Sequence, residues 1–98
     1  MILVVAKAQA KAGEAQALMQ AAKICIEATL QEEGNISYTM LQEVFDENKF
    51  TFLEKWESLQ ALDAHSKSAH FQAFGASVQS LLAAELMIEV YNADPVKS

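Results

Sequence analysis

The sequence has no arginine, one cysteine, one proline and three glycines. So little proline and glycine excludes collagen-like and linker-rich chains, and a 52% hydrophobic, 20% charged composition excludes a disordered one. A chain of 98 residues has the length of one domain with one hydrophobic core. We therefore predict a single domain over residues 1–98, in which residues 94–98 form a frayed tail.

The scattered lysines, the single cysteine and the lack of a long apolar run limit which partners the protein can bind and where in the cell we expect it. The seven lysines are scattered and the net charge is −6, whereas nucleic-acid binding relies on clustered cations, so we expect no nucleic-acid partner. Cys25 has no second cysteine for an intramolecular disulfide, and the N-terminus lacks the features of a signal peptide. No apolar run approaches the roughly 20 residues that span a bilayer. We expect a cytoplasmic protein that does not bind membranes.

Hydrophobic periodicity predicts four strands and three helices. The expected strands are 2–9, 35–45, 50–57 and 85–92, and the expected helices are 14–34, 59–66 and 69–82. Ser58 and Ser68 are expected to cap the second and third helices, and Gly34 to end the first. The polar residues 46–49 are expected to form the turn of a hairpin between the second and third strands.

This order of elements is β-α-β-β-α-β with the second helix broken, which is the ferredoxin-like split β-α-β pattern of an α+β protein. Its helices cover one face of the sheet. The opposite face then carries several apolar side chains that need a partner, and the same face of a second copy would cover them in a homodimer. These side chains are Leu3, Val5, Leu41, Leu53 and Met87.

Chemistry is expected in the segment Phe50–Phe71. Both histidines and the only tryptophan, Trp56, fall within 15 positions of one another there. Glu54 shares a strand face with Trp56, and a carboxylate that points toward helices is costly to bury unpaired. Glu54 would therefore hold a histidine, a backbone N–H or water, or it would lie at an open end of the strand in contact with solvent.

His65 and His70 are five residues apart across a helix break, which is not the spacing of a helical zinc site, so we expect no metal. A histidine is commonly a structural residue, but two of them at one bend could also transfer protons near neutral pH. Both interpretations stay open. Tyr38 is expected to pack at the rim of the core, and Cys25 to be an inert buried thiol.

Four short motifs resemble one known family in their order and spacing. They are GNISY at 34–38, FLEKWE at 52–57, ALDAH at 61–65 and AHF at 69–71. Together they resemble the antibiotic biosynthesis monooxygenase (ABM) family, including its small quinol-monooxygenase-like proteins. The resemblance spans nearly the whole chain and implies a dimeric α+β barrel built from ferredoxin-like subunits. One departure is Ala12-Gly13, where the family often has Pro-Gly.

The resemblance implies that dioxygen oxidises a phenolic, quinol or polyketide-like substrate without flavin, haem or metal. His65 or His70 would remove a hydroxyl proton, and Glu54 would orient a histidine or the substrate. The family's haem-degrading branch uses an asparagine in its first strand. The first strand here has no asparagine, which disfavours haem degradation as the activity. Alternatives are an isomerase of a small carbonyl compound, as in the branch that processes a phosphorylated autoinducer, and a non-catalytic dimeric ligand-binding module. The expected substrate-binding residues are Trp56, Tyr38, Glu54, Phe71, Phe52 and Phe74.

Overall fold

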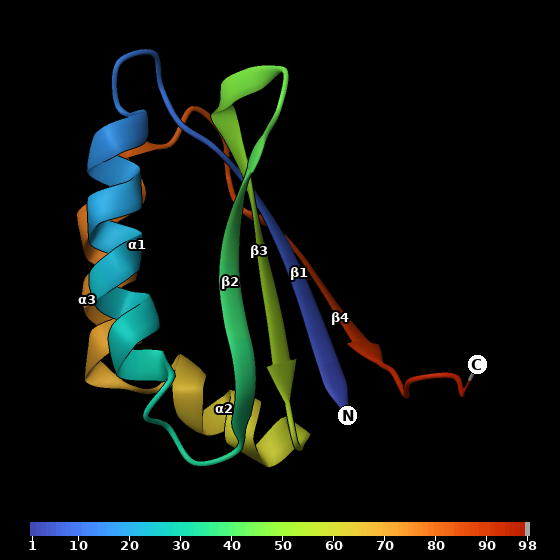
Figure 1. Ribbon diagram of the computed structural model, residues 1–98. Helices are drawn as coiled ribbons and strands as arrows, with labels where there is room; N and C mark the ends of the chain where they lie inside the picture. The colour runs from blue at the N-terminus through green and yellow to red at the C-terminus, as the bar shows by residue number, and fades with distance from the viewer. Residues whose placement is uncertain (98) are drawn as a thin grey trace.

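The computed structural model describes residues 1–97 and has one four-stranded antiparallel sheet with the strand order β2-β3-β1-β4 (Figure 1). The elements are β1 (Ile2–Gln9), α1 (Ala15–Thr29), β2 (Asn35–Glu43), β3 (Asp46–Trp56), α2 (Leu59–Ser66), α3 (Ala69–Val78), the short 3-10 helix η1 (Gln79–Leu81) and β4 (Met87–Asn92). The ferredoxin-like α+β prediction is confirmed, including the broken second helix.

The helices lie on one side of the sheet, where α1 and α3 run side by side and α2 crosses near one end (Figure 1). Strand register explains which residues face them, because Val4 lies opposite Glu54 and Ala6 lies opposite Phe52. Leu18 of α1 is fully buried against this face, which contributes about 2 kcal/mol to stability. The helix-facing positions of β1 and β3 are almost all buried, as the alternation of the sequence predicts.

The other face of the sheet is not covered by any element of the described chain. Leu3, Val5 and Leu53 are partly exposed there, and Leu41 and Met87 are 48% and 71% exposed. The register places all five on this face, opposite the helices, as predicted.

Two serine caps fix the break between α2 and α3. The hydroxyl of Ser58 accepts the N–H of Ala61 at 3.1 Å, and that of Ser68 accepts the N–H of Phe71 at 3.2 Å. Both predicted N-caps are confirmed, and they satisfy donors that a helix start leaves free. The break places His65 in the last turn of α2 and the next histidine in the first turn of α3.

The first helix ends earlier than predicted. It stops at Thr29, and residues 30–34 form an irregular connection in which Glu32 lies. Acidic side chains at the end of a helix oppose its dipole, which disfavours another turn. Gly34 adopts a φ of +86°, but just before β2 and not at the helix end. A side chain at Gly34 would also collide with α2, because its Cβ would lie 2.5 Å from that of Ala61.

The hairpin turn was predicted at the wrong residues. The turn consists of Val44 and Phe45, which are 89% and 98% exposed, and β3 begins directly after them at Asp46. The expected polar turn belongs to the start of β3, where Asp46 pairs with Glu43 and residues 47–49 bulge before Phe50 pairs with Gln42. The side chain of Asp46 accepts the N–H of Asn48 within this irregular start. The boundaries at the end of the chain also move, since α3 gives way to η1 after Val78 and β4 begins at Met87.

The N-terminus lies beside the segment that follows β4, at one end of the sheet. The amino group of Met1 donates to the carbonyl of Ala93 at 2.9 Å and to the side chain of Asp94 at 3.2 Å. Residues 93–97 have no regular secondary structure, and Ser98, the last residue of the predicted tail, is outside the described residues. Within residues 1–97 no helix is both long and apolar enough to cross a membrane.

Candidate active site

A cavity of about 220 Å³ lies between the helix-facing side of the sheet and helices α2 and α3. Most of its lining is apolar, and of the described residues no lysine contributes to it. On the β4 side it is bounded by Ile88 and Val90, which are about half exposed, so the cavity meets solvent there. Its lining residues are Val4, Ala6, Tyr38, Phe52, Glu54, Leu62, His65, Ser66, Phe71, Phe74, Leu86, Ile88 and Val90.

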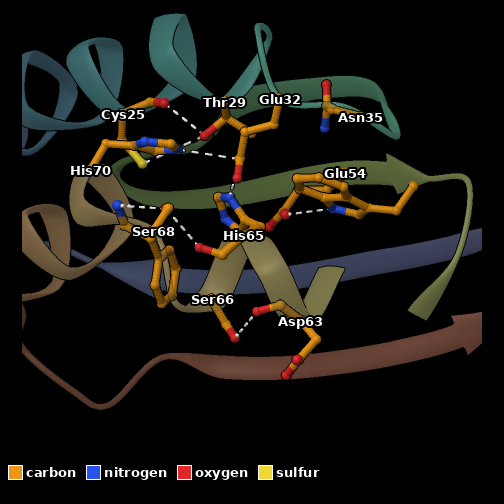
Figure 2. Close-up of polar contacts among 12 residues, drawn as sticks. Cys25, Thr29, Glu32, Asn35, Glu54, Asp63, His65, Ser66, Ser68 and His70 are labelled. Carbon is orange, nitrogen blue, oxygen red and sulfur yellow. Dashed lines mark hydrogen bonds and ion pairs between the residues drawn. The ribbon is translucent and has the colours of Figure 1, made fainter. Parts of the chain in front are cut away.

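His65 is the most buried polar group of the lining, with 2% of the residue exposed. Its Nδ1 atom lies 2.6 Å from Oε2 of Glu32 (Figure 2). An ionised carboxylate can only accept hydrogen bonds, so Nδ1 carries the proton and Nε2 carries a lone pair. This Nε2 atom is buried and has no hydrogen-bond partner among residues 1–97. A buried acceptor without a donor is uncommon and marks a position where a ligand could bind.

Aromatic rings surround the imidazole of His65. The ring centroids of Trp56 and Phe71 each lie 4.8 Å from its own, and that of Tyr38 lies 6.0 Å away. Burial by these rings lowers the pKa of His65, and the hydrogen bond that His65 donates to Glu32 partly offsets this effect. The imidazole is therefore neutral at pH 7 and can accept a proton.

Glu32 joins the two histidines. Its Oε2 atom also lies 3.2 Å from Nε2 of His70, so one oxygen contacts both imidazoles (Figure 2). The His70 side chain is 24% exposed, lies on the far side of Glu32 and does not line the cavity. Glu32 was not predicted from the sequence to belong to the site. Its position after a helix C-terminus, where the dipole disfavours an acid, was a signal that the carboxylate needs other partners.

Glu54 is a second carboxylate at the cavity and is 6% exposed. It accepts the indole N–H of Trp56 at 3.0 Å, and this partner was not among those expected from the sequence. Burial raises the pKa of Glu54, an effect that the bond from Trp56 opposes and the nearby charge of Glu32 reinforces. The carboxyl group can therefore hold a proton at a higher pH than an exposed glutamate.

Two further ionisable groups near the site stay protonated. Burial raises the pKa of Tyr38, so its phenol can donate a hydrogen bond to a molecule in the cavity. Tyr38 also packs edge-on against Phe52, with ring centroids 6.1 Å apart. Cys25 is 2% exposed, and burial raises the pKa of its thiol. A thiol of this kind is a poor nucleophile.

The structure brings the predicted residues together as a set that lines the cavity and a set that contacts those lining residues from outside it. Trp56 is completely buried and does not line the cavity, but it packs on His65 and binds Glu54. His70 does not line the cavity, but it binds Glu32 and its ring centroid lies 5.9 Å from that of His65. The other predicted residues line the cavity directly: His65, Tyr38, Glu54, Phe71, Phe52 and Phe74.

Comparisons with known proteins agree on one family. Residues 1–77 match the family model described as antibiotic biosynthesis monooxygenase. YcnE of Bacillus subtilis, which is named as a candidate monooxygenase, is 35% identical over 88% of this chain and 90% of its own length. A conserved protein of Methanosarcina mazei is 38% identical, with a TM-score of 0.91 over 95% of this chain and 92% of its own.

A more distant structure supports the fold alone. A protein of Nitrosomonas europaea with an antibiotic biosynthesis monooxygenase title superposes with a TM-score of 0.92 at 22% identity. The match covers 95% of this chain and 98% of that one. The ferredoxin-like arrangement is therefore shared over the whole domain.

Proposed function

Because this chain belongs to the antibiotic biosynthesis monooxygenase family, we propose that it oxidises a small phenol or quinol with dioxygen and that His65 is the base. The observation that carries this proposal is the buried, unpartnered Nε2 atom of His65, a residue of the cavity lining. A substrate hydroxyl that reached Nε2 would supply the missing donor.

The proposed reaction begins with proton transfer. The substrate hydroxyl gives its proton to Nε2 of His65, and the carboxylate of Glu32 stabilises the resulting imidazolium through Nδ1. The phenolate left in the cavity is electron-rich and reacts with dioxygen itself, so no flavin, haem or metal is required. One oxygen atom enters the ring, which becomes a hydroxyquinone, and the other leaves as water. A quinol and one dioxygen then give one hydroxyquinone and one water.

The cavity favours a single-ring, uncharged substrate. A cavity of about 150 Å³ is enough to hold benzene, so the 220 Å³ here suits one substituted ring better than a fused polyketide. Its lining of residues such as Phe52, Phe71 and Phe74 suits a flat aromatic molecule. Glu54 and Tyr38 provide polar atoms that can orient the substrate's oxygens.

In this proposal His70 is a positioning residue. Its Nε2 atom contacts the same Glu32 oxygen as His65 and would keep that oxygen aligned with Nδ1 of His65. Trp56 would also position the site. It lies outside the cavity, packs against the imidazole of His65 and donates its indole N–H to Glu54.

We further propose that the protein is a homodimer that packs through the outer faces of its two sheets. This face presents Leu41, Met87 and Tyr91 with 48%, 71% and 45% of each residue exposed. Apolar faces of this kind are costly to leave in water, and a second copy offers a self-complementary cover.

Isomerisation of a small carbonyl compound is the alternative reaction for the same base. The cavity is less suited to a phosphorylated substrate of such an isomerase. Among the described residues no lysine lines the cavity, and the chain has no arginine to bind a phosphate. A ligand-binding module without catalysis would also use an apolar cavity, but it would not need an oriented base.

Oxygen uptake tests the proposal. Purified, colourless protein should consume dioxygen with methyl-substituted hydroquinones and form one product for each dioxygen. His65→Gln should lower the rate by about 10²–10⁴-fold, as loss of a general base does. The matched control is Asp63→Asn, because Asp63 is an exposed residue of α2 that pairs with Lys67. Unchanged turnover in His65→Gln would exclude the base assignment, and turnover without oxygen would favour the isomerase.

A further inference from the structure

We propose that Glu32, His65 and His70 form a binding site for a divalent transition-metal ion such as Zn²⁺, and that the bound ion converts Nε2 of His65 from a proton acceptor into a donor. The binding site stands on geometry alone. The effect on His65 rests on the proposed function, in which Nε2 is the base. The ion would be an inhibitor of the reaction and not a participant in it.

The three side chains already converge. One ligand atom from each lies within 4.8 Å of the others, and the residues come from the connection after α1, from α2 and from α3. Two imidazole nitrogens and a carboxylate oxygen are a donor set that Zn²⁺ uses in proteins. With bonds of about 2.0–2.1 Å, tetrahedral ligand atoms lie roughly 3.3 Å apart. The separation of 3.2 Å between Glu32 Oε2 and His70 Nε2 already has this value.

The remaining adjustment is small. The pair of Glu32 Oε2 and His65 Nδ1 would widen from 2.6 Å, and His70 would approach Nδ1 of His65. Glu32 lies in an irregular connection, where backbone hydrogen bonds restrain it less than in a helix. Glu32 and His70 have side chains 17% and 24% exposed, so an ion could enter from that side and keep a water as its fourth ligand.

The charges favour a cation at this position. Among the ion pairs of residues 1–97, Glu32 pairs with the two histidines and with no lysine. A second carboxylate, Glu54, is buried close enough for the charge of Glu32 to contribute to its raised pKa. No lysine among residues 1–97 pairs with the Glu32 carboxylate, so a bound divalent ion would supply the positive charge that no fixed cation provides there.

Metal binding would change which nitrogen of His65 carries the proton. Without metal, Nδ1–H donates to Glu32 and Nε2 holds the lone pair. A metal at this position takes the lone pair of Nδ1, so the proton of a neutral imidazole must reside on Nε2. The Nε2 atom then donates hydrogen bonds and no longer accepts a proton. The ion would lie at the Nδ1 edge of the imidazole, next to Glu32, and would not occupy the cavity.

Calorimetric titration with ZnCl₂, repeated by Co²⁺ absorption, tests the site in the absence of substrate. We expect one ion per chain, and at least tenfold weaker binding in both Glu32→Gln and His70→Gln, which keep side-chain volume and hydrogen-bonding groups. Asp63→Asn should bind like the wild type, because this exposed carboxylate belongs to the pair with Lys67. Absence of binding, or equal binding by all four proteins, would overturn the site. Circular dichroism would verify that each variant is folded.

Nitrogen NMR of ¹⁵N-histidine-labelled protein tests the switch without any substrate. Zinc should move the His65 Nε2 resonance from the unprotonated to the protonated range, and EDTA should reverse the change. Bound zinc with an unprotonated Nε2 would overturn the switch while leaving the site intact. If oxidation of quinols is also observed, stoichiometric zinc should inhibit it at least tenfold in the wild type. If no substrate is ever oxidised, the binding and NMR results still decide both parts.

Discussion

Nδ1 of His65 lies 2.6 Å from Oε2 of Glu32, a residue 33 positions earlier in the chain. This contact fixes the tautomer of the imidazole and leaves its other nitrogen without a hydrogen-bond partner among residues 1–97. Because the base in the proposed reaction becomes positively charged, the carboxylate should bind it more strongly in the transition state than in the resting protein.

Glu32→Gln should therefore reduce turnover while the protein stays folded. The amide oxygen can still accept the Nδ1 proton, but it lacks the charge that stabilises imidazolium. Hydrogen bonds to charged groups contribute about 1.5–3 kcal/mol, so we expect a loss of roughly 10- to 100-fold in kcat with little change in KM. Steady-state oxygen uptake measures both constants. A variant with wild-type kcat would show that Glu32 does not assist the base.

His70→Gln should have a smaller effect than Glu32→Gln, because His70 does not line the cavity and acts through the carboxylate. We expect kcat to fall about threefold to tenfold, which corresponds to the roughly 0.5–1.5 kcal/mol contributed by one hydrogen bond. KM should not change. The double variant Glu32→Gln/His70→Gln should be no slower than Glu32→Gln alone, since both residues act on the same imidazole. Additive losses would mean that His70 has an independent role.

Local patterns predicted most of the fold. The strand β1, the two serine caps and the helix-facing positions of β3 depend on neighbours in sequence, and the structure confirms them. Two boundaries were wrong for local reasons. The first helix stops at Thr29 because acidic residues follow it, and the hairpin turns at Val44-Phe45, which have no turn-forming chemistry.

The candidate site was predictable only in part. The clustering of His65, His70 and Trp56 was visible in the sequence, but the contact between Glu32 and the histidines depends on how the connection after α1 meets α2. Contacts of such long sequence separation follow from tertiary packing and leave no periodic signal. The Glu54–Trp56 hydrogen bond is different, because it joins side chains two residues apart on the same face of β3, and the indole N–H was not among the partners considered for Glu54.

Glu54→Gln should stabilise the protein at neutral pH. Burial raises the pKa of Glu54, so the folded state holds its proton more tightly than the unfolded state. The stabilising effect of this proton is complete below the unfolded pKa and is lost as the pH rises through the folded pKa. Glutamine resembles the protonated acid and can still accept the indole N–H of Trp56.

Thermal unfolding of wild type and Glu54→Gln between pH 4 and pH 8 measures this effect. The two proteins should melt at similar temperatures at pH 4, and the variant should melt higher at pH 8. Each kcal/mol of added stability raises Tm by about 4–8 °C in a domain of this size. A difference in Tm that did not vary with pH would contradict the burial argument. The gain in stability should accompany weaker substrate binding, because the carboxyl group lines the cavity.

Val90→Phe should narrow the range of substrates. Val90 lines the cavity where it meets solvent and is 49% exposed, so the larger ring can be accommodated without disturbing the core. We expect KM for two-ring quinols to rise at least tenfold and KM for single-ring quinols to change less than threefold, as small changes in an apolar pocket discriminate by about 1–3 kcal/mol. Val96→Phe is the matched control, because Val96 is 92% exposed and does not line the cavity. Equal effects on both substrates would place the entrance elsewhere.

Met87→Glu should separate the proposed homodimer into monomers. Met87 is 71% exposed on the outer face of the sheet, where a charge would be buried against the second copy. Light scattering after size exclusion should give twice the 10.8 kDa chain mass for the wild type and the chain mass for the variant. Ile24→Glu is the matched control, because Ile24 is 72% exposed but belongs to α1, on the other side of the molecule. A wild-type monomer at micromolar concentration would exclude the dimer, and a dimeric Met87→Glu would place its interface on another face.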